Sequence, residues 1–317
     1  MPKHNDLVLL TGTANLPLAK DIGKRLKKTV HETVSEFADG EKRIIIPENL
    51  RRRDVFIIQP TSPPTDSNIM ELLLMIDAAR RASATEITAI TPYFGYSRQD
   101  RKEARAAISA SLVASLIEHA GANRIVTIDM HSEQSQGSIQ SPWDNLYASF
   151  SLVPAIKSKF HSNLIVASPD KGGVSKATYY AERLRADGIA IVYKERDIKK
   201  KNHSKVLDMI GEVGGKDVLL VDDMIDTAGT ICGAADLLKK RGARSIRAAA
   251  THGLFSKPAI ARIAKSPIQE IFITDTVELK NEVVKNPKIN VISVGKLLAE
   301  AIRCIHTGDS LSAKFNR

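Results

Sequence analysis

The 317-residue chain has only two cysteines, Cys232 and Cys304. Two cysteines cannot build a disulfide framework, so a reducing compartment is the default and we expect a cytoplasmic protein. Neither cysteine lies at a zinc-ligand spacing from another cysteine or from a histidine pair. This excludes the common structural zinc patterns.

Long apolar runs are missing as well. None approaches the roughly 20 residues needed to cross a bilayer. The apolar part of the opening MPKHNDLVLLTG is too short for a secretory signal and instead predicts a first strand. We therefore expect no membrane partner. With 43% hydrophobic and 26% charged residues, the chain is long enough to form two globular cores.

Aromatic residues make up only 5% of the chain and do not interleave with the basic residues, although the net charge is +10. Lys and Arg are spread over short groups at 51–53, 80–81, 98–102 and 199–201. Nucleic-acid modules combine basic patches with aromatic stacking residues or a recognisable reading motif. The pattern therefore argues against nucleic acid and favours nucleotides and sugar phosphates as partners.

The segment 217–231, DVLLVDDMIDTAGTI, carries the most informative pattern. Its apolar run, Val218–Val221, is typical of a buried parallel strand. Three acids follow at once, Asp222, Asp223 and Asp226. Carboxylates at a strand end suit sugar hydroxyls or a hydrated Mg2+. The alternative is that they only cap a helix and start a turn.

A small hydroxyl-rich turn follows these acids. Thr227, Ala228, Gly229 and Thr230 precede a helix expected over Cys232–Lys240. Backbone N–H groups at a helix N-terminus bind phosphate, because the helix dipole and the unpaired donors favour an anion there. Acids and turn together predict a phosphorylated sugar as the ligand. The segment resembles the phosphoribosyl-diphosphate signature shared by type I phosphoribosyltransferases and ribose-phosphate diphosphokinases, and it does not separate the two.

A weak internal repeat divides the chain. His4–Leu26 lines up with Ser162–Leu184, at an offset of 158 residues, and the segment starting at Arg53 parallels the one starting at Lys216. Apolar strands alternate with amphipathic helices in both halves, which predicts an α/β fold with largely parallel sheets. The alternative is a chance similarity among α/β units.

We expect two domains from this repeat. Residues 1–148 are assigned to an N-terminal nucleotide-binding domain, with 307–317 folding back onto it, and residues 149–306 to a C-terminal sugar-phosphate domain. Only the second copy has the paired acids and the TAGT turn, because the first copy has QPTSPPTDSN at the same place.

Two turns of the first half carry groups that suit a nucleotide. SEFADGE contains Phe37, Asp39 and Glu41, and YSRQDRK contains Arg98 and Gln99. A planar aromatic ring, hydrogen-bonding side chains and guanidinium groups are what a purine and its phosphates require.

Other candidate residues follow expected strands, where α/β proteins bind ligands. His131, beside Asp129, suits a Mg2+-nucleotide, and Asp170 lies in a Gly-rich turn that suits an anion or a metal. Lys194 and Arg196 are two residues apart and so face the same side of a strand. Two cations there would stabilise negative charge on transferring phosphates.

FADGE, YSRQDRK, DMHSEQSQG, PWDNLYA, SPDKGG, KER and VDDMIDTAGT, in this order, resemble the ribose-phosphate diphosphokinase family in its common phosphate-activated class, over nearly the whole chain. The resemblance implies two tandem duplicated type I phosphoribosyltransferase-like domains. It also implies transfer of the diphosphoryl group of Mg-ATP to the 1-hydroxyl of ribose 5-phosphate, which yields 5-phosphoribosyl 1-diphosphate and AMP for nucleotide biosynthesis. Mg2+ as cofactor and a homohexamer are further implications.

The resemblance assigns roles residue by residue. It implies a catalytic role for Lys194 and Arg196, and Mg2+ binding by His131 and Asp170. The residues implied for ATP are Phe37, Asp39, Gly40, Glu41, Arg98 and Gln99. Those implied for ribose 5-phosphate are Arg196, Asp222, Asp223, Asp226, Thr227, Ala228, Gly229 and Thr230.

Some positions depart from the family pattern. The loop 98–110 is one residue shorter, Ala107 replaces a typical Pro, Ser138 and Ile139 replace a Phe pair, and Lys171 replaces a small apolar residue. The changed loops keep open the alternative of a non-catalytic homologue that regulates an active partner. A phosphoribosyltransferase is a further alternative, against which the extra domain weighs.

Overall fold

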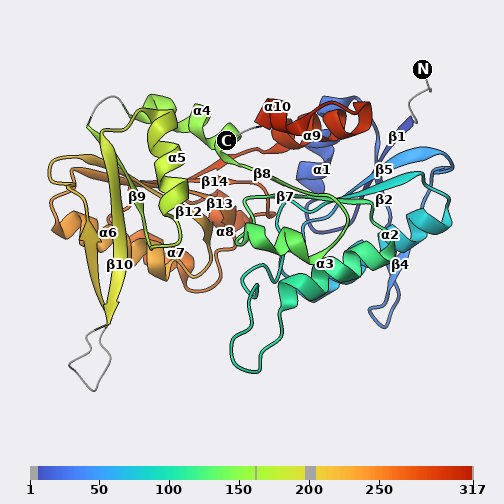
Figure 1. The fold of residues 1–317 in the computed structure, drawn as a ribbon, viewed down its shortest axis with the longest axis horizontal. Helices are drawn as coiled ribbons and strands as arrows, with labels where there is room; N and C mark the ends of the chain where they lie inside the picture. The colour runs from blue at the N-terminus through green and yellow to red at the C-terminus, as the bar shows by residue number, and fades with distance from the viewer. Residues whose placement is uncertain (1–5, 161–162, 197–204, 316–317) are drawn as a thin grey trace. The chain divides into compact units, whose positions relative to one another are not determined.

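The computed structural model describes residues 6–160, 163–196 and 205–315, and for 194–196 and 205–207 only the backbone. The described residues form two compact units (Figure 1). Unit 1 takes 6–148, 276–278 and 293–315, and unit 2 takes 149–275 and 279–292.

Unit 1 is built on a six-stranded sheet in the order β2-β1-β5-β6-β7-β8, in which all neighbours pair in parallel. A separate antiparallel hairpin joins β3 and β4. Helices α1 and α9 lie on one side of the sheet and α2 and α3 on the other (Figure 1). The elements are β1 (Asp6–Thr11), α1 (Leu16–Leu26), β2 (Val30–Glu32), β3 (Val34–Glu36), β4 (Lys42–Ile44), β5 (Arg53–Ile58), α2 (Thr65–Arg81), β6 (Glu86–Ile90), α3 (Ser109–Ala120), β7 (Arg124–Ile128), η1 (Glu133–Ser138), β8 (Trp143–Leu146), α9 (Gly295–Thr307) and α10 (Leu311–Phe315).

Unit 2 has a seven-stranded sheet in the order β11-β10-β9-β12-β13-β14-β15. Its strands are parallel except where β11 pairs antiparallel with β10. The elements are α4 (Ser149–Ile156), η2 (Lys157–Lys159), β9 (Leu164–Ser168), α5 (Val174–Leu184), β10 (Gly188–Arg196), β11 (Lys205–Ile210), β12 (Asp217–Ile225), α6 (Gly229–Lys240), β13 (Ser245–Gly253), α7 (Ala259–Lys265), β14 (Glu270–Thr274), α8 (Asn281–Val284) and β15 (Ile289–Ile292).

The two sheets share one strand order once β11 is set aside, since β10, β9, β12, β13, β14 and β15 take the places of β2, β1, β5, β6, β7 and β8. The register differs by one residue: Leu7 lies opposite Asp54 in unit 1, whereas its counterpart Ile165 lies opposite Val218 in unit 2. The predicted α/β fold with duplicated, largely parallel domains is thus confirmed.

The C-terminal segment departs from the expected domain boundary. The second domain was expected to reach residue 306, but 293–306 belong to unit 1. Helix α9 packs against α1, and Ser293 donates a hydrogen bond to Asp21 over 3.1 Å. The described tail lies in unit 1 as well, where Lys314 pairs with Glu300 at 2.5 Å.

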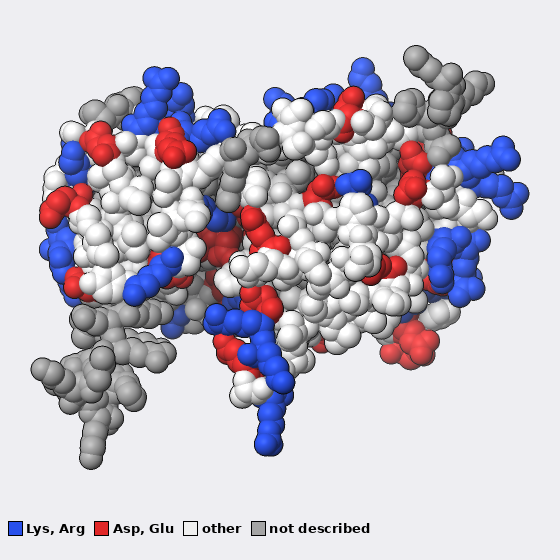
Figure 2. All heavy atoms as spheres, in the orientation of Figure 1, with Lys and Arg blue, Asp and Glu red and all other residues white. Residues whose placement is uncertain are grey.

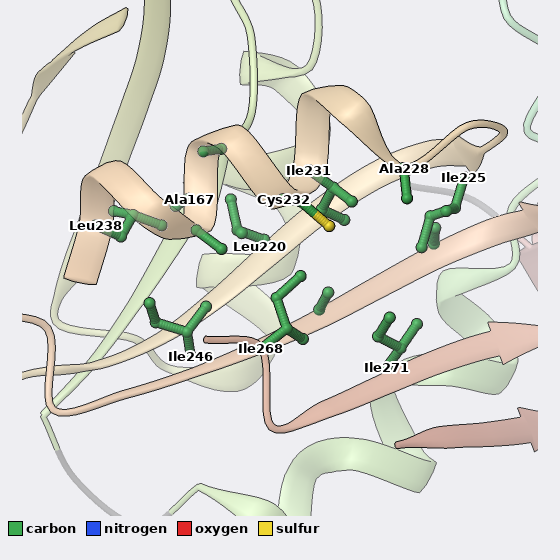
Figure 3. Close-up of a cluster of buried hydrophobic side chains, with 14 of the residues drawn as sticks. Ala167, Leu220, Ile225, Ala228, Ile231, Cys232, Leu238, Ile246, Ile268 and Ile271 are labelled. Atoms are coloured by element: carbon green, nitrogen blue, oxygen red, sulfur yellow. The ribbon is translucent and has the colours of Figure 1, made fainter. Parts of the chain in front are cut away.

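The core of unit 2 lies between α6 and the sheet. Leu220 on β12 and Leu238 on α6 are fully buried, and Ile231 and Cys232 fill the layer between the two elements (Figure 3). Because helices cover both faces of a parallel sheet, its strands read as continuous apolar runs. Val218–Val221 is such a run.

A lysine closes the end of α7. Lys288 donates from Nζ to the carbonyl oxygens of Ile263 at 3.0 Å, Ala264 at 3.4 Å and Ser266 at 3.0 Å. A cation stabilises the carbonyls that end a helix, since they have no partner within it.

We expect Lys288→Met to lower the free energy of unfolding by about 1–2 kcal/mol, because charge-assisted hydrogen bonds to these carbonyls are lost. Urea denaturation followed by far-UV circular dichroism measures the effect. Lys285→Met, on an exposed neighbour, is the control. Equal midpoints for the two variants would contradict the prediction.

Candidate active site

Two of the three acids, Asp222 and Asp223, lie within a strand rather than after it, and Asp226 follows its last residue. β12 runs to Ile225, beyond the expected end at Val221, because its pairing continues with Met224 opposite His252 on β13. Asp222 and Asp223 are half-buried, and the backbone N–H of Asp223 donates to Asp222 Oδ1 over 2.8 Å. The sheet therefore fixes the backbone that carries both carboxyl groups.

These acids crowd negative charge into one place. Burial, and then the charge of Asp223, raise the pKa of the Asp222 carboxyl well above its usual range, and Asp170 adds to the effect. A cation or several hydroxyl donors would relieve this repulsion. The donor set therefore fits a divalent cation with oxygen ligands or the hydroxyls of a sugar.

The turn after β12 is strained and exposed. Ala228 is buried and has a φ of 59°, a left-handed conformation that is uncommon for a residue with a side chain. Strain of this kind is found at binding sites that the surrounding structure holds in place. Thr227, Gly229 and Thr230 are exposed around it, and α6 begins at Gly229, before the expected start at Cys232. The turn thus forms an open helix N-terminus suited to a phosphate.

Arg262 on α7 was not identified from the sequence. Its Nη1 donates to the carbonyl oxygen of Thr227 over 2.9 Å. The same nitrogen would lie 3.3 Å from a Cβ placed on Gly229, so the guanidinium lies against the turn. No local pattern marks this arginine, because the contact joins positions 35 residues apart.

The Gly-rich turn after β9 is ordered by its own aspartate. Asp170 Oδ1 accepts from the N–H groups of Gly172 at 2.9 Å and Gly173 at 3.1 Å, the two residues that precede α5.

The departure at Lys171 has a structural use. Its ammonium lies 5.3 Å from the centre of the Tyr193 ring on β10, a cation–π distance. Tyr193 also donates to Asp208 on β11 over 3.3 Å. The turn after β9 is therefore tied to the strand pair that carries Lys194 and Arg196. The backbone of those two residues lies at the end of β10, but their side chains lie outside the described part of the chain.

In unit 1, Phe37, Asp39, Gly40 and Glu41 form the tip of the β3–β4 hairpin. The tip is closed by hydrogen bonds from Phe37 N to Glu41 O at 2.9 Å and from Glu41 N to Asp39 Oδ1 at 3.1 Å. The Phe37 ring is 50% exposed and therefore accessible for stacking on a planar ligand. Acidic side chains gather on this hairpin in Figure 2.

Arg98 and Gln99 precede a long exposed loop that leads into α3. Gln99 Oε1 accepts from Ser109 Oγ over 2.7 Å, so this glutamine supports the start of α3. Basic side chains project along the loop in Figure 2. The loop and the β3–β4 hairpin extend from separate regions of unit 1 (Figure 1).

His131 lies in an exposed loop that Asn145 helps to position. Asn145 Oδ1 accepts from Met130 N over 3.0 Å. Asp129 is buried and accepts from Ala148 N over 3.0 Å, so this carboxylate supports the loop. The departure at Ile139 fills the unit 1 core.

No preformed metal cage is present in the described residues, where no three His, Cys, Asp or Glu side chains are grouped to hold an ion. His131 lies in unit 1 and Asp170 in unit 2. Mg2+ commonly binds through one or two carboxylates together with substrate phosphates, rather than in an all-protein cage. The donors available are thus consistent with an ion that arrives with a ligand.

Comparisons with known proteins cover nearly the full chain. Residues 7–121 match the family described as the N-terminal domain of ribose phosphate pyrophosphokinase, and residues 196–316 match the phosphoribosyl synthetase-associated domain. The ribose-phosphate pyrophosphokinase of Helicobacter hepaticus is 47% identical, with 97% of this chain and 98% of that protein covered. The enzyme of that name from Burkholderia pseudomallei is 46% identical, with 99% of both covered. The crystal structure of phosphoribosylpyrophosphate synthetase from Mycobacterium smegmatis superimposes with a TM-score of 0.90 and 38% identity, covering 96% of this chain and 100% of that one.

Proposed function

The chain belongs to the ribose-phosphate pyrophosphokinase family, and from this we propose that its two units divide the substrates, with ATP bound by unit 1 and ribose 5-phosphate by unit 2. The chain transfers the diphosphoryl group of ATP to the 1-hydroxyl of ribose 5-phosphate, which gives 5-phosphoribosyl 1-diphosphate and AMP. Full-length similarity to enzymes of this name fits neither a non-catalytic homologue nor a phosphoribosyltransferase.

One observation supports the assignment of the sugar phosphate to unit 2. The carboxyl groups of β12 lead into the strained Ala228 and the open N-terminus of α6. In this proposal Asp222 and Asp223 bind the ribose hydroxyls, while the N–H groups and hydroxyls of 226–230 bind the 5-phosphate. Unit 1 has no such acids at the end of β5, where Gln59 and Pro60 follow the strand.

The chemistry required of the protein is mainly positioning and neutralisation of charge. Lys194 and Arg196 would stabilise the negative charge of the phosphoryl group in transfer. Phe37, Asp39, Gly40, Glu41, Arg98 and Gln99 would bind ATP. Mg2+, held by His131 and Asp170, would neutralise phosphate oxygens when bound.

The assembly and the location of the protein belong to the same proposal. Within the described residues, no helix combines the length and the apolar character needed to span a membrane. We expect a cytoplasmic homohexamer, and sedimentation analysis of the purified protein would show a different mass if the number of subunits is wrong.

The direct assay offers ribose 5-phosphate and Mg-ATP and follows AMP and 5-phosphoribosyl 1-diphosphate, with and without inorganic phosphate. Both products should form in equal amounts. Absence of AMP in the presence of phosphate would contradict the proposed function. Consumption of 5-phosphoribosyl 1-diphosphate on addition of a purine base would favour a phosphoribosyltransferase instead.

Arg262→Met should raise the KM for ribose 5-phosphate about 2- to 12-fold, the range for loss of one net hydrogen bond of about 0.5–1.5 kcal/mol. The arginine holds the carbonyl of Thr227 and thereby the turn that binds the phosphate. Lys265→Met, on the same helix, is the control because it removes an exposed cation from α7 without touching the turn. Steady-state kinetics with equal KM values for both variants would exclude a role of Arg262 in this turn.

A further inference from the structure

Unit 1 contains a fully buried carboxylate that the proposed chemistry does not use. Glu71, on α2, has an exposed fraction of 0%. Its carboxylate accepts from Thr13 N at 3.0 Å, from Thr13 Oγ1 at 2.8 Å and from Gln59 Nε2 at 2.9 Å. Burying a charge is costly unless hydrogen bonds and an opposite charge compensate for it. A carboxylate so fully bonded therefore holds several segments in place.

The first of these segments is the loop 12–15 after β1, the counterpart of the turn that contains Asp170 in unit 2. Thr13 of this loop is bonded to Glu71, and the backbone N–H of Ala14 donates a hydrogen bond to Gln59 Oε1 over 3.3 Å. A Cβ on Gly12 would lie 2.4 Å from Gln59 Oε1 and 2.9 Å from Glu71 Oε2, so these side chains lie against the loop backbone. The backbone N–H groups of Thr13 and Ala14 could otherwise donate to a bound anion. Here they donate to side chains of unit 1 itself.

The second segment is the β3–β4 hairpin. Lys42, at the start of β4, lies 3.4 Å from Glu71 Oε1 and 2.5 Å from Glu36 Oε2, and its side chain is 19% exposed. The hydrogen bonds to Glu36 and, less strongly, to Glu71 raise the pKa of Lys42 above its usual value. Lys42 therefore joins the buried carboxylate to both strands of the hairpin.

The hairpin needs such an anchor. A two-stranded hairpin is marginally stable by itself, and β3 and β4 pair only with each other, outside the six-stranded sheet. Val34 and Ile44 pack against the core of unit 1 and hold the base of the hairpin. Apolar contacts are not directional, whereas the ion pair sets which way the strands, and thus the tip, are oriented.

We propose that Glu71 and Lys42 are positioning residues that anchor the β3–β4 hairpin and so set the placement of its tip, residues 37–41, for nucleotide binding. The proposal rests on the proposed role of that tip in binding ATP. It predicts an effect on the nucleotide alone, since the pair lies in unit 1 and the sugar phosphate is assigned to unit 2.

The test compares Lys42→Met with Lys42→Arg and with Lys28→Met in the full-length protein. Lys42→Met leaves the carboxylate of Glu71 its hydrogen bonds from Thr13 and Gln59, whereas a change at Glu71 would remove them as well. Lys28 forms an exposed ion pair with Asp6 at 2.7 Å in the same unit and is the matched control. Hydrogen exchange is followed at the amides of Phe37, Gly40 and Ile45, which are hydrogen-bonded within and beside the hairpin. Initial rates give the KM for each substrate.

We expect Lys42→Met to speed exchange at these three amides and to raise the KM for ATP about 3- to 10-fold, with an unchanged KM for ribose 5-phosphate. Lys42→Arg should restore most of both properties, and Lys28→Met should resemble the wild type. Exchange that is equal in Lys42→Met and Lys28→Met would overturn the proposal. So would faster exchange throughout β1 and β5, or faster hairpin exchange with an unchanged KM for ATP.

The two readouts separate this inference from the proposed function. Exchange does not depend on turnover, so it reports on the anchor even in an inactive protein. A wild type that makes no AMP would contradict the proposed function. Faster hairpin exchange in Lys42→Met of that same protein would still support the anchoring role of the pair.

Discussion

Replacing Lys194 with alanine is expected to lower turnover by on the order of 10²-fold or more, the scale for removing a preorganised group that stabilises transition-state charge. The diphosphoryl group carries several negative charges, and transfer spreads them over its oxygens. A cation held at a fixed position stabilises this charge without reorganisation during the reaction. The loss should therefore fall on kcat more than on either KM.

The backbone around Lys194 is suited to that task. β10 pairs with β9 on one side and with β11 on the other, and Lys194 lies opposite Leu207. Tyr193, the preceding residue, is tied to Lys171 and Asp208. The strand pair thus has contacts that fix its position on the sheet up to the residue before Lys194.

Initial-rate kinetics at saturating substrates measure the effect, and Lys239→Ala provides a control because it removes an exposed lysine from the far end of α6. A turnover within twofold of the control would show that Lys194 does not act in catalysis. If only a KM rises, the lysine contributes to binding and not to the transition state.

Asp222→Asn is expected to lower kcat/KM for ribose 5-phosphate by roughly 10- to 150-fold, from the loss of charged hydrogen bonds worth about 1.5–3 kcal/mol. The same change is expected to stabilise the protein without ligand at neutral pH. Both effects have one cause. The half-buried carboxylate lies beside Asp223, which favours ligand binding and disfavours the empty site.

The direction of the pH dependence follows from the raised pKa. An acid whose folded pKa exceeds its unfolded value binds more protons in the folded state between the two values. This contribution to stability is fully present below the unfolded pKa of Asp222 and is lost as the pH rises from there through the folded pKa. The amide of the Asp222→Asn variant carries no such charge, so the stability gain of the variant should grow as the pH rises and vanish in acid.

Thermal unfolding of the wild type and the Asp222→Asn variant from acid to neutral pH, without substrate or Mg2+, tests the stability effect. Asp236→Asn on α6 is the control, since that carboxyl is exposed. A variant that is less stable than the wild type at neutral pH would show that Asp222 forms stabilising contacts that outweigh its burial. An unchanged kcat/KM would remove Asp222 from the sugar site.

Much of the fold could be predicted from local patterns. The runs Leu7–Leu10 and Val218–Val221 are apolar because helices cover both faces of each sheet. The internal repeat predicted the duplicated domains because both copies have the same order of strands and helices. The extent of β12 could not be predicted. Acids rarely favour strands by themselves, and here pairing with β13 keeps Asp222 and Asp223 in one.

The sequence by itself determined the α/β class, the duplicated order of elements, the family and the position of the acid-rich turn, because each depends on residues that are neighbours in the chain. Only the tertiary structure decided that Arg262 holds this turn, that Glu71 closes the first loop of unit 1 and that residues 293–306 belong with that unit. These contacts join residues far apart in the chain, and such pairs are selected by packing, which no local pattern records.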